Sequence, residues 1–141
     1  IGSVDRKYYK KIYNLKKYKK IRFLNTISLK NKEYKEFLKY DLLVLPSISE
    51  NFSLIILESL AKGLPVLTTN ETPWNIIQNE NAGWIINNSP IELKLVLYQI
   101  FGSFDKELFI KRKNAIKIAK KFTKETLSKL YLKTYQRILT T

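Results

Sequence analysis

The stretch that decides the fold is residues 47–58, which read S-I-S-E-N-F-S-L-I-I-L-E directly after the apolar run of residues 42–46. An apolar run that ends in a Pro-Ser turn predicts a buried strand, and the following L-I-I-L-E predicts a helix. Glu50 then falls in the strand-to-helix loop, and Glu58 falls about two turns down the helix. Between them lie the first backbone N–H groups of the helix, which lack acceptors within the helix and attract anions. Two carboxylates around such a helix start suit a ligand with hydroxyl groups on either side of a diphosphate.

Short apolar runs alternate with helical patterns along the rest of the chain. The expected strands are Ile21–Asn25, Asp41–Leu45, Pro65–Thr69 and Trp84–Asn87. The helix after residue 52 is expected to run from about 53 to 62 and to end at Gly63. This alternation predicts an α/β fold, a Rossmann-like parallel sheet with helices on both faces. Ligands bind such sheets at the carboxyl ends of the strands, which is where residues 47–53 lie.

Two Ser/Thr-Pro pairs predict further helix starts. Thr72-Pro73 and Ser89-Pro90 each place an N-cap residue before a proline at the first helical position. Ser89 is also expected to form a capping box with Glu92. The helix after Ser89 is expected to pack through an apolar stripe at spacings of three and four, formed by Leu93, Val96, Leu97, Ile100 and Phe101.

Two more helices are expected at about 105–121 and 123–139. The last one carries an apolar stripe that includes Leu127, Leu130, Tyr131 and Ile138. We expect the sheet to leave part of this stripe uncovered. Trp74 and Trp84 flank expected strands, and we interpret them as packing against the core or a cleft wall rather than as stacking platforms.

The composition is that of one globular domain and excludes several chemistries. Hydrophobic residues make up 45% of the 141 residues, and the longest apolar runs, of about five residues, are too short to span a membrane. Cysteine and histidine are absent, which excludes disulfides, the usual zinc sites and triads built on these residues. The glycines stand at 2, 63, 83 and 102, so no Gly-rich dinucleotide or P-loop motif exists. No two of the three aspartates are neighbours, so we expect no metal site, and no cofactor is predicted.

The net charge of +14 is distributed unevenly. Residues 1–40 hold 13 basic and 3 acidic side chains, and residues 103–141 hold 11 and 3, whereas residues 41–102 hold 2 and 6. Basic flanks are compatible with nucleic acid or an anionic membrane surface, but lysines on solvated helix faces explain them more simply. The motif lies in the acidic middle, which argues against nucleic acid as the main ligand.

The sequence around the two glutamates closely resembles the donor-binding domain of family 4 glycosyltransferases. The resemblance rests on L-P-S-I-S-E-N-F-S-L-I-I-L-E-S-L-A-K-G-L-P-V-L-T-T at residues 45–69, followed by T-P-W at 72–74 and A-G-W at 82–84. It is dense over residues 41–87 and extends to the first residues, I-G-S-V-D-R-K-Y-Y. In that family a glutamate, seven residues and a second glutamate follow a Pro-Ser pair.

The resemblance implies a GT-B fold, with residues 1–141 as the nucleotide-sugar-binding C-terminal half and the acceptor domain outside this chain. It also implies retaining, metal-independent sugar transfer. By the family pattern Glu50 would be catalytic and contact the donor sugar, and Glu58 would contact the ribose. Sugar and phosphates would lie along Asn51, Phe52, Ser53 and Leu54, and the base would meet Thr26 and Ile27.

The chain departs from the family pattern in three places. Ser53 stands where the family usually has glycine, in a turn that approaches the ligand closely, although its hydroxyl could cap the helix. Asn25 replaces a glycine beside the expected base site. The Arg/Lys pair that neutralises the leaving diphosphate lies upstream of residue 1 in the family pattern, so we expect the isolated chain not to turn over.

By family analogy the expected setting is bacterial surface polysaccharide synthesis, such as lipopolysaccharide, O-antigen or capsule. The enzyme would then be cytoplasmic, with its basic flanks making peripheral contact with the inner face of the membrane near a lipid-linked or glycan acceptor. Two other readings remain open on sequence alone. One is a non-catalytic basic module that binds nucleic acid or anionic membrane, and the other is a phosphorylase or epimerase with a related nucleotide-sugar fold.

Overall fold

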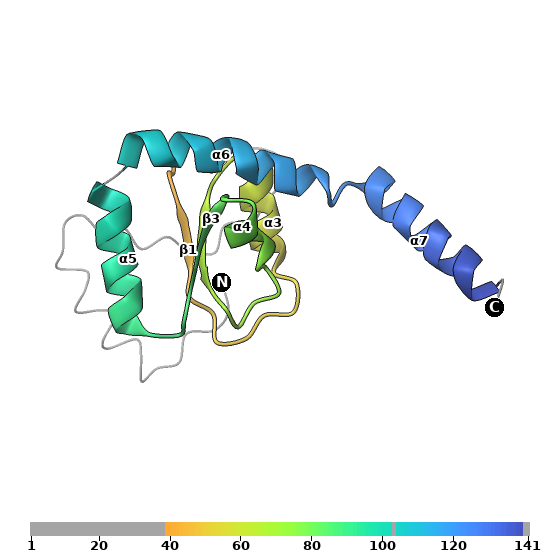
Figure 1. Ribbon diagram of the computed structural model, residues 1–141, viewed down its shortest axis with the longest axis horizontal. Coiled ribbons are helices and arrows are strands. Elements are labelled where there is room, and N and C mark those ends of the chain that lie inside the picture. The colour runs from red at the N-terminus through yellow and green to blue at the C-terminus, as the bar shows by residue number, and fades with distance from the viewer. Residues whose placement is uncertain (1–38, 103, 140–141) are drawn as a thin grey trace. The chain divides into compact units, whose positions relative to one another are not determined.

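A three-stranded parallel sheet forms the centre of the computed structural model, which describes residues 39–102 and 104–139 (Figure 1). The strands are β1 (Leu43–Leu45), β2 (Val66–Thr69) and β3 (Gly83–Ile86), in the order β1-β2-β3. The strands predicted within this part of the chain are confirmed, with ends that differ from the predicted ones by one or two residues. The strand predicted at Ile21–Asn25 lies outside the described residues.

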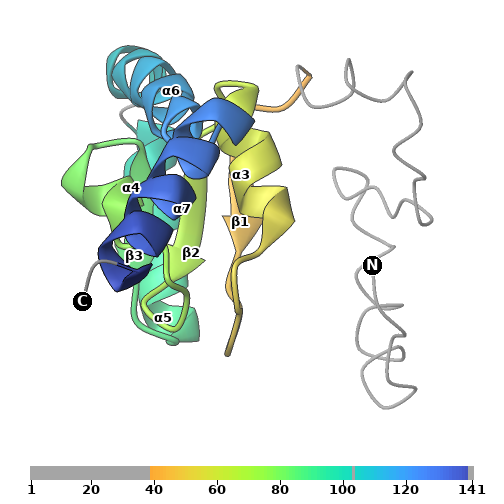
Figure 2. The same ribbon diagram turned by 90° about the vertical axis from the view of Figure 1, so that its right-hand side faces the viewer.

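Helices cover both faces of the sheet, as the sequence predicts. The chain forms α3 (Leu54–Ala61), α4 (Ile76–Asn79), α5 (Pro90–Gly102), α6 (Phe104–Lys120) and α7 (Lys124–Leu139). Figure 1 shows α3 and α4 on one side of the strands and α5 on the other, and Figure 2 shows the same layers from a perpendicular direction. The fold is the α/β arrangement expected of the C-terminal, Rossmann-like domain of a GT-B protein.

The core has two parts because neighbouring residues of a strand point to opposite faces. Val66 of β2 packs with Ile56 and Leu60 of α3 and with Ile118 of α6, all fully buried. The next residue of β2, Leu67, packs on the other face. There it meets a second cluster contributed by β3 and by the inner side of α5, whose members include Ile86, Ile100, Leu93, Val96 and Leu97. The predicted stripe of α5 is thus confirmed except for Phe101, which is 67% exposed.

Two helices end in the same hydrogen-bonded C-terminal motif. After α3, Gly63 takes a positive φ of 70°, its N–H donates to the Leu60 carbonyl, and the next N–H donates to the Ser59 carbonyl. After α4, Asn81 takes the same role with φ 52°. This pattern satisfies the last carbonyls of a helix and requires a left-handed residue, which glycine adopts most easily and asparagine next. It turns the chain directly into β2 and β3.

The two predicted helix starts differ in outcome. Ser89 accepts a hydrogen bond from the Glu92 N–H at 3.4 Å, so α5 begins as predicted. The other half of the predicted capping box is wrong, because the Glu92 carboxylate accepts from the Asn87 amide and the Ser89 N–H donates to the Asn87 carbonyl. The prediction of a helix start at Thr72-Pro73 is wrong, because α4 begins at Ile76 with Asn75 as N-cap. No helix begins at Thr72 because its hydroxyl donates to the Thr69 carbonyl, at 3.0 Å, and closes a turn after β2.

Polar contacts fasten α6 across the amino-terminal edge of the sheet. The buried Lys111 ammonium donates to Asn81 and lies 4.5 Å from the centre of the Trp84 ring. Directly after the helix, the Lys121 ammonium pairs with the Glu80 carboxylate at 2.6 Å. The hydrogen bond from Lys121 holds the pKa of the Glu80 carboxyl below its usual value. These contacts tie α6 to the turn between α4 and β3.

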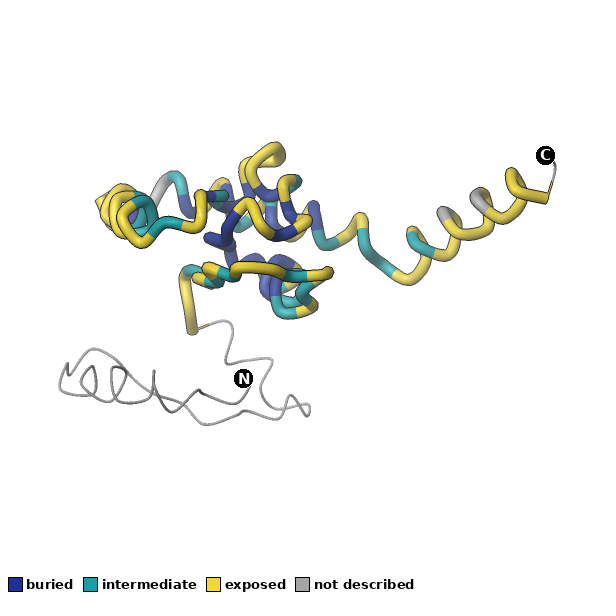
Figure 3. The backbone as a smooth tube through the Cα atoms, turned by 90° about the horizontal axis from the view of Figure 1, so that it is seen from below, coloured by how far each residue is buried: buried dark blue, intermediate teal, exposed yellow. Residues whose placement is uncertain are grey.

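The last helix, α7, is exposed along most of its length (Figure 3). Its exposed apolar side chains are Tyr131, Leu132, Tyr135, Ile138 and Leu139. The expectation that part of its apolar stripe stays uncovered is therefore confirmed. None of the helices in residues 39–102 and 104–139 has the length and apolar character needed to cross a membrane.

Candidate functional site

The loop of residues 46–53 follows the carboxyl end of β1, at the lower edge of the sheet in Figure 1. Glu50 lies in this loop, and Glu58 lies in α3, as predicted; both are half-buried. One detail of the prediction is wrong. Because α3 begins at Leu54, Glu58 stands just over one turn into the helix rather than two. The structure therefore places one carboxylate before the helix start and one shortly after it.

Two buried threonines of β2 hold the backbone at the start of this loop. The Thr68 hydroxyl donates to the Leu45 carbonyl at 2.8 Å, and the Thr69 hydroxyl donates to the Ser47 carbonyl. Both threonines are fully buried, so each hydroxyl needs a partner and finds it in the loop. The first residues after β1 are thus tied to the neighbouring strand.

A serine of the same loop contacts the first glutamate. The Ser47 hydroxyl donates to Oε1 of Glu50 at 2.9 Å. In the described part of the chain no other side chain is hydrogen-bonded to this carboxylate. Glu50 can accept hydrogen bonds but, when ionised, cannot donate them, which suits the hydroxyl groups of a sugar.

An aromatic cluster supports the end of the loop. The Phe52 ring lies 5.1 Å from the Trp74 ring and 5.7 Å from the Phe122 ring, and the latter two are 5.4 Å apart. Trp74 is 1% exposed, which confirms its interpretation as a packing residue. The cluster joins the loop after β1, the loop after β2 and the junction between α6 and α7. Phe52 therefore rests on segments far from it in sequence.

Trp74 also fixes the direction of a backbone N–H. Its indole N–H donates to the Phe52 carbonyl. Because the peptide between Phe52 and Ser53 is trans, its C=O and N–H point to opposite sides. The Ser53 N–H consequently points away from Trp74. Within the described residues this N–H and those of Leu54 and Ile55 have no acceptor, whereas the Ile56 N–H donates to the Ser53 carbonyl.

Ser53 adopts the backbone conformation that glycine favours. Its φ is 53° and its ψ is 82°, and its side chain makes no capping hydrogen bond to the helix. The expectation that the Ser53 hydroxyl could cap α3 is wrong, because in this left-handed conformation it bonds none of the first N–H groups. The chain thus keeps the turn that the glycine of the family pattern would make, but with a strained residue.

Replacing Ser53 with glycine is expected to stabilise the protein by about 0.5 to 1 kcal/mol, since the left-handed strain exceeds the extra chain entropy of glycine. Chemical denaturation followed by circular dichroism measures the change. Ser49→Gly is the matched control in the same loop. Among the described residues only Ser53 and Asn81 combine a side chain with positive φ, so Ser49→Gly should lower stability. A lower midpoint for Ser53→Gly would contradict the strain argument.

Two of the predicted site residues lie in a part of the chain that the structure does not describe, and the residues that position the loop were not predicted from the sequence. Thr26 and Ile27, predicted at the base site, lie outside the described residues. Asn51 and Phe52 are exposed in the loop, and α3 begins at Leu54, one residue after the predicted start. The support from Thr69 and Trp74 was not predicted, because their contacts cross 22 positions of sequence.

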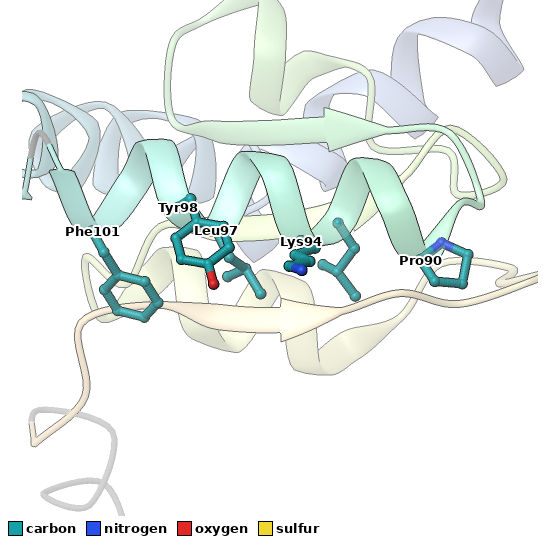
Figure 4. Close-up of a pocket in the computed structure, with 6 residues that line it drawn as sticks. Pro90, Lys94, Leu97, Tyr98 and Phe101 are labelled. Carbon is teal, nitrogen blue, oxygen red and sulfur yellow. The ribbon is translucent and has the colours of Figure 1, made fainter.

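A pocket lies along α5 and shares no residue with the predicted site (Figure 4). Its lining is mostly apolar and consists of Pro90, Leu93, Lys94, Leu97, Tyr98 and Phe101. Such a lining offers little to a diphosphate, so we do not place the donor there. No three acidic side chains gather in a metal-binding arrangement within residues 39–102 and 104–139.

A model of a known protein family matches most of the chain. The family model described as glycosyl transferases group 1 matches residues 1–122 of this chain. The match includes the whole sheet, the loop of residues 46–53 and α3 to α6. No curated protein is matched by the chain.

Proposed function

The chain belongs to the glycosyl transferases of group 1, and from this membership we propose that residues 1–141 are the donor-binding domain of a retaining, metal-independent glycosyltransferase. The observation that supports this best is the helix start between two carboxylates. The N–H groups of Ser53, Leu54 and Ile55 lack acceptors among the described residues, and Glu50 and Glu58 stand on either side of them. A nucleotide-sugar offers a diphosphate to such N–H groups and hydroxyl groups to such carboxylates.

Each end of the donor would meet one glutamate. We assign the sugar to Glu50, in the loop, and the ribose to Glu58, on α3. The diphosphate would lie over the start of α3, beside Asn51 and Phe52, where the helix dipole favours negative charge. The base would reach Thr26 and Ile27, as in the family pattern.

The acceptor and the setting are proposed by analogy. We expect the reaction to be a hexosyl transfer to a glycan or lipid-linked acceptor held by a separate acceptor domain, in bacterial surface polysaccharide synthesis such as that of lipopolysaccharide. The protein would work in the cytoplasm, with its basic segments at the inner face of the membrane.

Replacing Glu58 with alanine is expected to weaken binding of nucleotide and nucleotide-sugar alike by about tenfold, or about 1.4 kcal/mol, through loss of a charge-assisted hydrogen bond to ribose. Isothermal titration calorimetry with UDP-glucose, GDP-mannose and ADP-glucose, and with UDP, GDP and ADP, measures this. We expect one base to bind best.

Glu125→Ala is the matched control, since Glu125 is an exposed glutamate in the first turn of α7. It should leave binding unchanged. Failure of the parent protein to bind any of the six compounds, or binding indifferent to Glu58, would overturn the proposal. Salt-sensitive binding to any polyanion without preference for these compounds would favour the basic-module alternative instead.

A further inference from the structure

Ser47 lies between the sheet and Glu50 in the hydrogen-bond network of the loop. We propose that Ser47 is a positioning residue for the donor sugar, which holds the Glu50 carboxylate in place and is itself held by Thr69. This inference rests on the proposed function, because it takes Glu50 to be the carboxylate that meets the sugar.

Ser47 is fixed at three points. Its N–H donates to the Leu45 carbonyl at 2.9 Å, its carbonyl accepts from the Thr69 hydroxyl, and its own hydroxyl donates to Glu50 at 2.9 Å. Thr69 is fully buried and belongs to β2, the central strand of the sheet. A continuous series of hydrogen bonds therefore runs from the sheet, through Ser47, to one oxygen of Glu50.

The consequence for Glu50 is a restricted side chain. A glutamate in a loop normally samples many rotamers, and ordering it when the sugar binds costs conformational entropy. Because Ser47 already holds Oε1, the carboxylate is ordered before the ligand arrives and presents Oε2 in a fixed direction. Binding groups that are ordered in advance lose less entropy on binding.

The proposal predicts that loss of the Ser47 hydroxyl weakens binding only of ligands that carry the sugar. Ser47→Ala is expected to lower the affinity for the nucleotide-sugar about tenfold and to change the affinity for the matching nucleoside diphosphate less than twofold. Calorimetry with whichever pair binds best among UDP-glucose and UDP, GDP-mannose and GDP, and ADP-glucose and ADP gives both values. Ser47→Thr, which keeps the hydroxyl, should restore most of the difference.

Two further variants test whether Ser47 affects sugar binding through Glu50. Ser49→Ala removes an exposed hydroxyl two positions away and should leave both affinities unchanged. In a Glu50→Ala background, Ser47→Ala should add no further loss, since the group that it positions is gone. Equal weakening of nucleotide and nucleotide-sugar by Ser47→Ala would indicate a merely structural serine and would overturn the inference, as would no weakening at all.

Failure of this inference differs from failure of the proposed function. If the parent protein binds no nucleotide, both the proposed function and the positioning role of Ser47 are refuted. Sugar-dependent binding that needs Glu58 and Glu50 but ignores Ser47 refutes the positioning role alone.

Discussion

Replacing Gly83 with alanine is expected to unfold the domain, or to lower its stability by at least about 4 kcal/mol, a large part of the 5 to 15 kcal/mol typical of domains. Gly83 opens β3, opposite Val66 of β2. A Cβ at this position would lie 2.0 Å from the Val66 carbonyl oxygen and 2.6 Å from Cγ2 of Ile77. The obstacle is backbone of the neighbouring strand, so no rotamer change relieves it, and β3 must separate from β2.

Circular dichroism during thermal and urea denaturation measures this effect, and Gly102→Ala is the matched control. A Cβ at Gly102, the last residue of α5, meets nothing within 4 Å. Its replacement should be neutral or stabilise the helix by up to about 1 kcal/mol. If Gly83→Ala melted within a few degrees of the parent protein, the close approach of β3 to β2 would have to be wrong.

Replacing Trp74 with alanine is expected to have the second large effect. It should lower the free energy of unfolding by about 3 to 5 kcal/mol and abolish donor binding. The truncation leaves a cavity under Phe52 and beside Phe122, since all three rings are within 6 Å of each other. It also removes the indole N–H that holds the Phe52 carbonyl. Stability is measured by urea denaturation, and binding by titration with the nucleoside diphosphate that binds best.

Trp74→Phe separates the ring from its N–H. This variant should retain most of the packing and lower the free energy of unfolding by about 1 to 2 kcal/mol. It should still weaken binding of the nucleoside diphosphate several-fold, because the Ser53 N–H is no longer oriented. Trp84→Phe serves as the control, since Trp84 packs on the opposite face of the sheet, against α5. Unchanged diphosphate binding by Trp74→Phe would show that the peptide keeps its direction without the indole.

The sequence predicts the sheet and most helices because their signals are local. Buried parallel strands read as continuous apolar runs, and the end of α3 is marked by Gly63, whose left-handed conformation the structure confirms. The false helix start at Thr72-Pro73 shows the limit of such signals. A threonine before proline is equally suited to a turn, and only the position of the Thr69 carbonyl decides between them.

The candidate site divides in the same way. Glu50 and Glu58 are recognisable from their spacing and surroundings, and the structure places them on either side of a helix start. What holds the loop of Glu50 in place is long-range: hydroxyl groups of β2 and the indole of Trp74 donate to carbonyls between the end of β1 and the start of α3. Such contacts have no sequence period, so a serine or a tryptophan at the right place remains indistinguishable from an ordinary packing residue.

The three-ring contact of Phe52, Trp74 and Phe122 has a consequence for exchanging the loop to which we assign the donor. A loop transplanted from another enzyme into residues 46–53 would arrive without the surface that seats its aromatic side chain, since two of the three rings belong to other segments. Exchange of the loop alone should give poorly ordered hybrids. The smallest transferable unit is the loop together with positions 74 and 122, which must be chosen as a matched set.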